Sequence, residues 1–229
     1  MSDALVEAGS GEPARLVVAL HGYGSCGRQI AAALTAAAGT VPRVLVFAPD
    51  GTAAASLAPA GRAWYPITSH AGEMALRSRS VAAAIAARLA VHQRRHGIAA
   101  EHTCVVGFSQ GTTVGAAILE QSDTCRSGVF VCGRLPPGPD RNRQRPLGGV
   151  RVLVIAGGRD RFAPPDLARA DLAAGWLGAQ ARLVVLTDLA HELRADVAAL
   201  AMAFAVGRRE DATAVADQGS DLTIPWRIS

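Results

Sequence analysis

The chain has 229 residues, half of them hydrophobic, which is enough for one large α/β domain with a sizeable core. Its formal net charge of +4 comes from arginines, spread along the sequence without interleaved aromatic residues. This distribution argues against nucleic-acid binding, and no apolar run approaches the roughly 18 residues that cross a bilayer.

Short runs of Val, Leu and Ile alternate with alanine-rich stretches at helical spacing. The predicted strands cover residues 15–20, 43–48, 102–108, 128–132, 150–156 and 182–186. The predicted helices cover residues 29–38, 73–95, 112–121, 165–177 and 192–206. This alternation predicts an α/β fold with a mostly parallel central sheet and helices on both faces, because parallel strands need crossover connections.

The periodic pattern defines a single domain over residues 15–206. Residues 1–14 are acidic and small, lack the layout of a secretory signal, and are expected to form a flexible N-terminus. Residues 207–229 are polar and aperiodic, which predicts a flexible C-terminal tail. We therefore expect a cytoplasmic protein without stable membrane insertion.

The cysteines form neither a C-x-x-C pair nor a dense framework. They are Cys26, Cys104, Cys125 and Cys132. Reduced thiols, mostly buried, are the expected state, and the sequence predicts no metal site and no cofactor.

A G-x-S-x-G motif, Gly107-Phe108-Ser109-Gln110-Gly111, lies between a predicted strand and a predicted helix. The two glycines allow a strand to reverse into a helix so tightly that the central serine is strained and exposed. The amide of Gln110 then lies at a helix N-terminus, where unpaired N–H groups favour a developing negative charge. The context predicts that Ser109 is a nucleophile.

A serine nucleophile needs a histidine base that a carboxylate orients. His191 follows the last predicted strand and opens the last helix, at the sheet edge where Ser109 must also lie. His21 follows a strand as well, but its glycine neighbours suggest that it shapes a turn of backbone amides. The other histidines near the middle of the chain are interpreted as solvent-facing or capping residues: His92, His96 and His102.

The carboxylate has two candidates, Asp160 and Asp188. Asp160 stands just beyond a predicted strand and is favoured, whereas Asp188 lies only three residues before His191 and suits a turn or cap. The resulting chain order of Ser, Asp and His, each at a strand end, is typical of the α/β-hydrolase triad.

Five segments together resemble the phospholipase/carboxylesterase branch of the α/β-hydrolases, which includes acyl-protein thioesterases and bacterial carboxylesterases. They are residues 20–24, residues 63–65, the motif around Ser109, residues 157–160 and residues 190–191. The resemblance covers about residues 15–206. It implies that Ser109 attacks, that His191 is first base and then acid, that Asp160 orients it, and that the amides of Tyr23 and Gln110 form the oxyanion hole.

Three features depart from the family pattern. Thr112 replaces a second glycine that members commonly have after Gly111, the N-terminal strands are curtailed, and the arginine-rich excursion 134–145 has no counterpart. Its arginines could meet an anionic group or belong to a solvated loop: Arg134, Arg141, Arg143 and Arg145. The residues expected to line an acyl pocket, each also compatible with ordinary packing, are Trp64, Tyr65, Leu135, Phe162 and Leu189.

The hypothesis from the sequence is a serine hydrolase that cleaves a small-molecule acyl ester or thioester through an acyl-enzyme. One alternative keeps the triad and passes the acyl group to another acceptor, as an acyltransferase or cyclase. A second alternative is a hydrolase-fold binding protein without catalysis, although the complete set of Ser109, Asp160 and His191 argues against it. The sequence is compatible with a homodimer.

Overall fold

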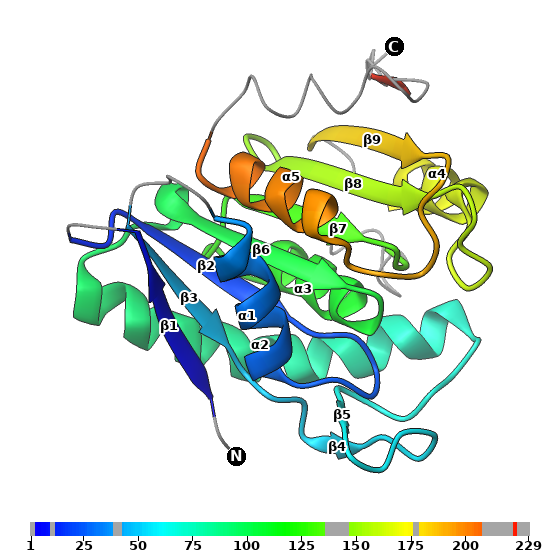
Figure 1. Ribbon diagram of the computed structural model, residues 1–229, viewed down its shortest axis with the longest axis horizontal. Helices are drawn as coiled ribbons and strands as arrows, with labels where there is room; N and C mark the ends of the chain where they lie inside the picture. The colour runs from blue at the N-terminus through cyan, green and yellow to red at the C-terminus, as the bar shows by residue number, and fades with distance from the viewer. Residues whose placement is uncertain are drawn as a thin grey trace.

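A single mixed sheet forms the centre of the protein in the computed structural model, which describes residues 3–9, 12–38, 43–135, 147–175, 179–207 and 222–223 (Figure 1). Within these residues its strand order is β1-β3-β2-β6-β7-β8-β9-β10. The strands are β1 Ala4–Ala8, β2 Arg15–Leu20, β3 Val44–Ala48, β6 Thr103–Phe108, β7 Ser127–Val131, β8 Arg151–Gly157, β9 Gln180–Leu186 and β10 Leu222–Thr223. The strands from β3 to β9 in this order are parallel, and the two edge strands are antiparallel to their neighbours.

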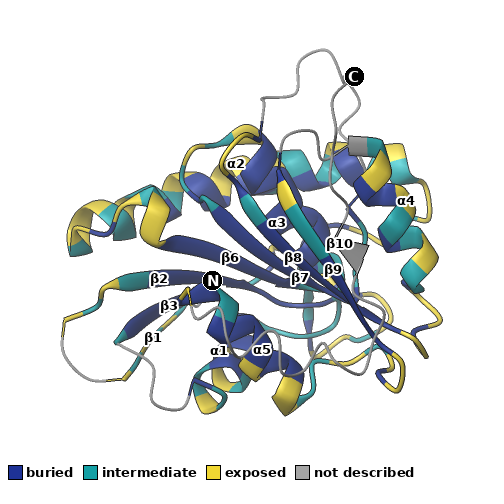
Figure 2. Cartoon of the chain, turned by 90° about the horizontal axis from the view of Figure 1, so that it is seen from above, coloured by how far each residue is buried: buried dark blue, intermediate teal, exposed yellow. Residues whose placement is uncertain are grey.

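Helices cover both faces of the sheet, as Figure 2 shows. The helices are α1 Gly27–Ala36, α2 Ala71–His96, α3 Gln110–Gln121, α4 Pro165–Gly175 and α5 Ala195–Ala205. One face carries α1 and α5, and the other carries α2, α3 and α4. The predicted mostly parallel sheet between two helical layers is confirmed.

Each central strand contributes side chains to two cores, because successive residues of a strand point to opposite faces. In β2, Leu16, Val18 and Leu20 pack on the face of α2 and α3, whereas Val17 and Ala19 pack on the face of α1 and α5. All five are fully buried. Burying each Leu or Val contributes about 1.5–3 kcal/mol relative to exposure, so the central strands are held rigidly at both faces.

The N-terminal prediction needs a correction. The sequence pattern predicts a flexible segment over residues 1–14, but Ala4–Ala8 forms an edge strand in register with Val44–Ala48 of β3. Its side chains alternate between half-buried and exposed, so its stability comes from the hydrogen bonds to β3 more than from burial. Most of the predicted tail 207–229 lies outside the described residues, and Leu222–Thr223 pairs with β9.

The cysteines are free thiols. Cys104, Cys125 and Cys132 are buried and Cys26 is half-buried, and burial raises the pKa of the Cys104 thiol to about 11. Among the helices of the described ranges, none combines the length and the apolar character that crossing a membrane requires.

An irregular segment separates β3 from α2. It contains two short paired strands, β4 Ala53–Ala54 and β5 Arg62–Ala63, which lie at the lower right of the molecule in Figure 1. This segment lies at the edge of the sheet where the parallel strands end, so it can wall a site there.

Candidate active site

Three polar residues follow three parallel strands. Ser109 comes directly after β6, Asp160 lies three residues after β8, and His191 lies five residues after β9. Strand β7 joins β6 to β8 in parallel register, so all three carboxyl ends meet at one edge of the sheet. This placement agrees with the prediction from the sequence.

The turn around Ser109 is strained. Ser109 has a φ of 53° and a ψ of −116°, a backbone conformation that residues with side chains rarely adopt. A Cβ atom at position 107 would lie 2.6 Å from the carbonyl oxygen of Gly111, and one at position 111 would lie 2.1 Å from that of Leu20. Both positions therefore require glycine, and the turn presents the serine hydroxyl at the sheet edge.

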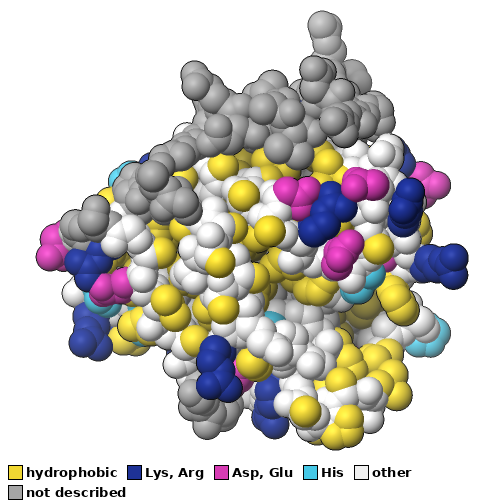
Figure 3. Space-filling model, viewed as in Figure 1, with side chains coloured by type: hydrophobic (Ala, Val, Ile, Leu, Met, Phe, Trp, Pro, Cys, Tyr) yellow, Lys and Arg dark blue, Asp and Glu magenta, His cyan; other side chains and the backbone are white. Residues whose placement is uncertain are grey.

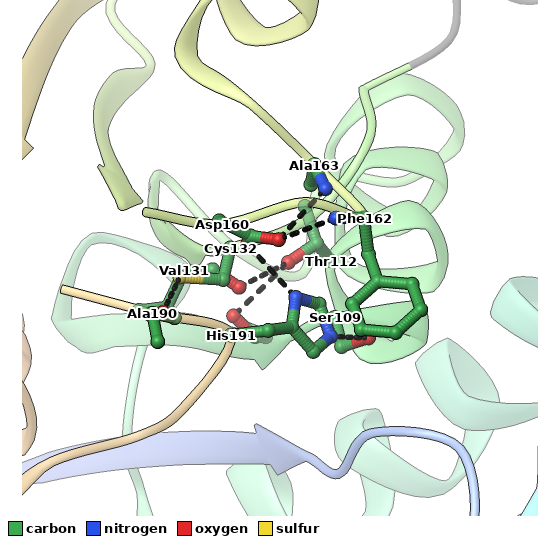
Figure 4. Close-up of polar contacts among 10 residues, drawn as sticks. Ser109, Thr112, Val131, Cys132, Asp160, Phe162, Ala163, Ala190 and His191 are labelled. Carbon is green, nitrogen blue, oxygen red and sulfur yellow. Dashed lines mark hydrogen bonds and ion pairs between the residues drawn. The ribbon is translucent and has the colours of Figure 1, made fainter. Parts of the chain in front are cut away.

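Ser109, His191 and Asp160 form a continuous hydrogen-bonded series (Figure 4). The Nε2 atom of His191 lies 2.8 Å from the Oγ atom of Ser109, and its Nδ1 atom lies 2.8 Å from Oδ2 of Asp160. The imidazole ring contacts two phenylalanine rings, with centroid distances of 5.3 Å to Phe108 and 5.0 Å to Phe162. These contacts add to the two hydrogen bonds that orient the imidazole.

Asp160 is 3% exposed and keeps its charge through hydrogen bonds. Its Oδ1 atom accepts from the backbone N–H of Phe162 at 2.8 Å and of Ala163 at 2.9 Å. Burial alone would raise the pKa of Asp160, but the N–H of Ala163, His191 and the N–H of Phe162 outweigh it and hold the pKa below its ordinary value. A buried carboxylate that stays ionised can orient an imidazole and stabilise its protonated form.

The rival carboxylate, Asp188, lies on the surface. Its Oδ2 atom accepts a hydrogen bond of 2.8 Å from Arg194, and this contact lowers the pKa of Asp188. Asp188 therefore forms a solvent-exposed ion pair at the start of α5, and the geometry favours Asp160 as the partner of His191.

The turn that carries Tyr23 lies against Ser109, and Gln110 follows Ser109 in the sequence. A Cβ atom at position 22 would lie 3.3 Å from Cβ of Ser109, so the turn that carries Tyr23 is in close contact with the serine. Gln110 begins α3. Among the hydrogen bonds of the described residues, neither the Tyr23 N–H nor the Gln110 N–H has an acceptor.

His21 is a neutral, buried side chain. Its Nε2 atom accepts from the N–H of Gly51 at 3.0 Å, so its Nδ1 atom carries the hydrogen and donates to the Gly22 carbonyl oxygen at 2.7 Å. Burial lowers the pKa of His21. Both ring nitrogens bind backbone groups, which agrees with the interpretation that His21 shapes the turn of amides.

A pocket of about 430 Å³ opens beside Ser109 and His191. Two of the five predicted lining residues, Tyr65 and Phe162, lie in its wall. Lining residues that the sequence analysis missed include Leu57, Ala58, Ile67, Met74, Thr113 and Cys132. In Figure 3, hydrophobic side chains cover the β4–β5 segment at the lower right of the molecule.

Trp64, Leu135 and Leu189 were predicted as pocket residues and lie outside the pocket lining. Trp64 is 3% exposed and both leucines are fully buried. The indole N–H of Trp64 donates to the carbonyl oxygen of His21 at 2.7 Å, so the ring points into the protein. A loop position near a strand end indicates proximity to the site, but the direction of each side chain depends on tertiary contacts.

Arg134, which belongs to the described part of the arginine-rich excursion, forms an ion pair with Asp171. The guanidinium of Arg134 makes two hydrogen bonds of 2.8 Å to the buried carboxylate of Asp171, which also accepts from the N–H of Leu135 at 2.7 Å. Arg134 therefore forms part of the pocket wall with its charge neutralised. The other three arginines of the prediction lie outside the described residues: Arg141, Arg143 and Arg145.

Thr112, which replaces the expected second glycine, is fully buried beneath the turn. Its hydroxyl lies 3.1 Å from the carbonyl oxygen of Gly107 and 3.3 Å from that of Val131, so it can donate to either one. The N–H of Ser109 also donates to Val131, at 2.9 Å. Thr112 therefore joins the turn around Ser109 to the end of β7.

In the part of the chain that the structure describes, the His, Cys, Asp and Glu side chains form no cluster of three or more that could hold a metal ion.

Comparison with known proteins gives one family and many related folds. The family model described as phospholipase/carboxylesterase matches residues 1–193. Solved structures with a similar fold include esterase PE8, with 23% identity, a TM-score of 0.72, and coverage of 89% of this chain and 96% of that one. No curated protein sequence matches the chain significantly.

Two further solved structures share the α/β-hydrolase fold. A carboxylesterase from Mesorhizobium loti is 20% identical, with a TM-score of 0.71, and the match covers 86% of this chain and 90% of the carboxylesterase chain. Acyl-protein thioesterase 2 from Zea mays is 16% identical, with a TM-score of 0.64, and the match covers 83% of this chain and 91% of the thioesterase chain. At these identities the likeness shows the fold.

Proposed function

Because the chain belongs to the phospholipase/carboxylesterase family, we propose that it is a serine hydrolase that cleaves carboxylic esters or thioesters through an acyl-enzyme. The observation that carries this proposal is the hydrogen-bonded series of Ser109, His191 and Asp160, in which both distances are 2.8 Å. A serine hydroxyl in contact with an oriented imidazole is the arrangement that nucleophilic acyl transfer needs.

In the acylation step, the substrate carbonyl lies beside Ser109 with its oxygen toward the amides of Tyr23 and Gln110. The Oγ atom of Ser109 attacks the carbonyl carbon while Nε2 of His191 takes the hydroxyl proton. Negative charge develops on the carbonyl oxygen, and the two N–H groups stabilise it. His191 then gives its proton to the departing alcohol or thiol, and the acyl group remains on Ser109.

Deacylation repeats these steps with water. His191 removes a proton from a water molecule, which attacks the acyl-enzyme, and the protonated imidazole returns that proton to Ser109 as the carboxylic acid leaves. Asp160 keeps its charge throughout, because its low pKa reflects hydrogen bonds that persist in both steps.

The acyl group fits the apolar part of the pocket. Tyr65, Met74 and Ile67 supply its wall, and the volume of about 430 Å³ is in the range of small-molecule sites. Burial raises the pKa of Tyr65 to about 12, so its side chain stays neutral beside the bound acyl group.

Ser109→Ala tests the proposal. We expect the variant to lose turnover of p-nitrophenyl butyrate and of a matched butyryl thioester by at least about 1,000-fold, while the fold is retained. Ser122→Ala is a suitable control, because that hydroxyl also makes hydrogen bonds at an end of α3 but lies away from the site. Turnover by Ser109→Ala equal to that of the Ser122 variant would contradict the proposal.

Two further measurements separate the alternatives. A fluorophosphonate probe should label wild-type protein and leave Ser109→Ala unlabelled, whereas a binding protein without catalysis would not react. Product analysis in the presence of an added amine or alcohol distinguishes transfer from hydrolysis: we expect the carboxylic acid as the main product.

A further inference from the structure

The side chain of Gln110 makes two hydrogen bonds that the reaction does not require. Its Oε1 atom accepts from the backbone N–H of Trp64 at 2.9 Å, and its Nε2 group donates to the carbonyl oxygen of Tyr65 at 2.8 Å. A backbone N–H can only donate and a carbonyl oxygen can only accept, so the orientation of the amide is fixed. A carboxylate or an amine could satisfy only one of the two contacts.

Trp64 continues these contacts into the turn that carries Tyr23. Its indole N–H donates to the carbonyl oxygen of His21 at 2.7 Å, and its ring stacks on the His21 imidazole with a centroid distance of 4.7 Å. The neighbouring residue Arg62 exchanges two backbone hydrogen bonds with the same turn: Gly24 N–H to Arg62 O at 2.9 Å and Arg62 N–H to Ser25 O at 2.8 Å.

His21 transmits this restraint to one particular peptide unit. Its Nδ1–H donates to the carbonyl oxygen of Gly22, and the same planar peptide carries the N–H of Tyr23. In a trans peptide the C=O and N–H bonds point in opposite directions, so holding the oxygen also sets the direction of the N–H. The other amide of the pair belongs to Gln110 itself.

We infer that the side chains of Gln110 and Trp64 are positioning groups that set the spacing and direction of the Tyr23 and Gln110 amides, and we call this pair of side chains the amide brace. This inference rests on the proposed function, because the two amides matter only if they stabilise an oxyanion. Two donors from distant segments act together only when their separation is fixed before the charge develops. The amide brace connects the two amides, because Gln110 contacts Trp64 and Trp64 contacts His21, which holds the Gly22–Tyr23 peptide.

Two substitutions break the amide brace at different points. Gln110→Met keeps the length of the side chain and removes both of its hydrogen bonds, whereas Trp64→Phe keeps an aromatic ring beside His21 and removes the indole N–H together with part of the ring volume. Loss of a whole oxyanion donor costs about 100- to 1,000-fold in kcat, so misalignment of a retained donor should cost about 10- to 100-fold. We expect kcat to fall by this amount in both variants, with KM changed by less than about threefold, because the contact gains strength only in the transition state.

Gln93→Met is the matched control. The side chain of Gln93 also joins separate segments, donating to Oγ1 of Thr103 at 2.8 Å and to the carbonyl oxygen of Thr124 at 2.7 Å. Thr103 begins β6 and Ser109 follows the end of that strand, so the residue that Gln93 contacts lies roughly 20 Å from the site. We expect a loss of thermal stability similar to that of Gln110→Met and unchanged kcat.

A trifluoromethyl ketone with the butyryl chain of the substrate tests the amides directly. Ser109 Oγ bonds to the ketone carbon, the serine proton goes to His191, and the carbonyl electron pair becomes an oxyanion facing the two amides. Across wild type, Gln110→Met and Trp64→Phe, the inhibition constant should rise in proportion to the fall in kcat/KM. A merely structural role would lower the melting temperature without this proportionality.

Three outcomes decide the inference. Parallel losses in turnover and ketone affinity, with the Gln93 variant fully active, support it. Turnover within about twofold of wild type in Gln110→Met and Trp64→Phe overturns it while leaving the proposed function intact, provided that Ser109→Ala is inactive. Full turnover by Ser109→Ala overturns the proposed function and the inference together.

Discussion

Gly111→Ala is expected to impair catalysis through a displacement that the structure defines. The added Cβ atom would lie 2.1 Å from the carbonyl oxygen of Leu20 and 2.8 Å from that of His21, whereas real Cβ atoms keep at least 3.0 Å from other atoms. The turn that begins at Leu20 must therefore move away from α3 by about 0.9 Å. A misplacement of about 1 Å can cost about 100-fold in rate, which corresponds to about 2.7 kcal/mol of transition-state stabilisation.

The assay is steady-state hydrolysis of p-nitrophenyl butyrate, combined with urea denaturation. We expect kcat of Gly111→Ala to fall about 100-fold, because the Tyr23 amide moves with the turn. Stability should fall by about 1–3 kcal/mol from overpacking, partly offset by the higher helix propensity of alanine. Gly72→Ala is the control, since a Cβ atom there meets nothing within 4 Å. A folded Gly111→Ala variant whose kcat stays within about threefold of wild type would refute this reasoning.

Three other predictions concern Asp160 and Thr112. Asp160→Asn should lower kcat about 10,000-fold in the same assay. Both oxygens of the carboxylate accept hydrogen bonds, one from the imidazole N–H and the other from two backbone N–H groups. In asparagine one of these positions becomes an NH2 group, which is a donor and would face another donor. The pKa of Asp160 is lowered in the folded protein, so its stabilising contribution is present above about pH 4 and is lost as the pH falls through the folded pKa. The difference in free energy of unfolding between wild type and Asp160→Asn should therefore shrink from pH 7 to pH 3 in urea titrations. Thr112→Val should cost about 1 kcal/mol of stability in urea, since it removes the buried hydroxyl that donates to one of two carbonyl oxygens, and Thr112→Ser should restore most of it.

The sequence predicts the central strands well because burial on both faces makes them continuous apolar runs. Residues 15–20 form a strand with the predicted bounds, and most other strands and helices differ by one to three residues at an end. β1 was missed because Ala4–Ala8 is a short run with a glutamate inside it, and the partner that stabilises it, β3, lies about 40 residues later. Pairing across that distance leaves no local pattern in a single sequence.

The polar part of the site was more predictable than the pocket. Ser109, Asp160 and His191 each follow a strand, and the parallel sheet brings strand ends together whatever the side chains do elsewhere. The topology of the sheet does not determine the direction of an apolar side chain on a loop. Trp64 turned inward because the His21 carbonyl oxygen accepts its N–H, while Leu57 and Ile67 remained exposed beside the pocket.

Leu189, which the sequence analysis predicted in the pocket, instead helps to hold the segment that carries His191. The segments after β8 and β9 bind each other through backbone hydrogen bonds, from Gly158 N–H to Leu186 O at 2.8 Å and from Arg159 N–H to Leu189 O at 2.9 Å. The Leu189 side chain is also fully buried, so the segments that carry Asp160 and His191 are held together as one unit. Ser109 reaches this unit from a separate turn, so its contact with His191 is the only link of the series that depends on the placement of the β6–α3 turn. The proposed reaction breaks and remakes that same link, which is why strain at Ser109 and rigidity at Asp160 and His191 are compatible in one site.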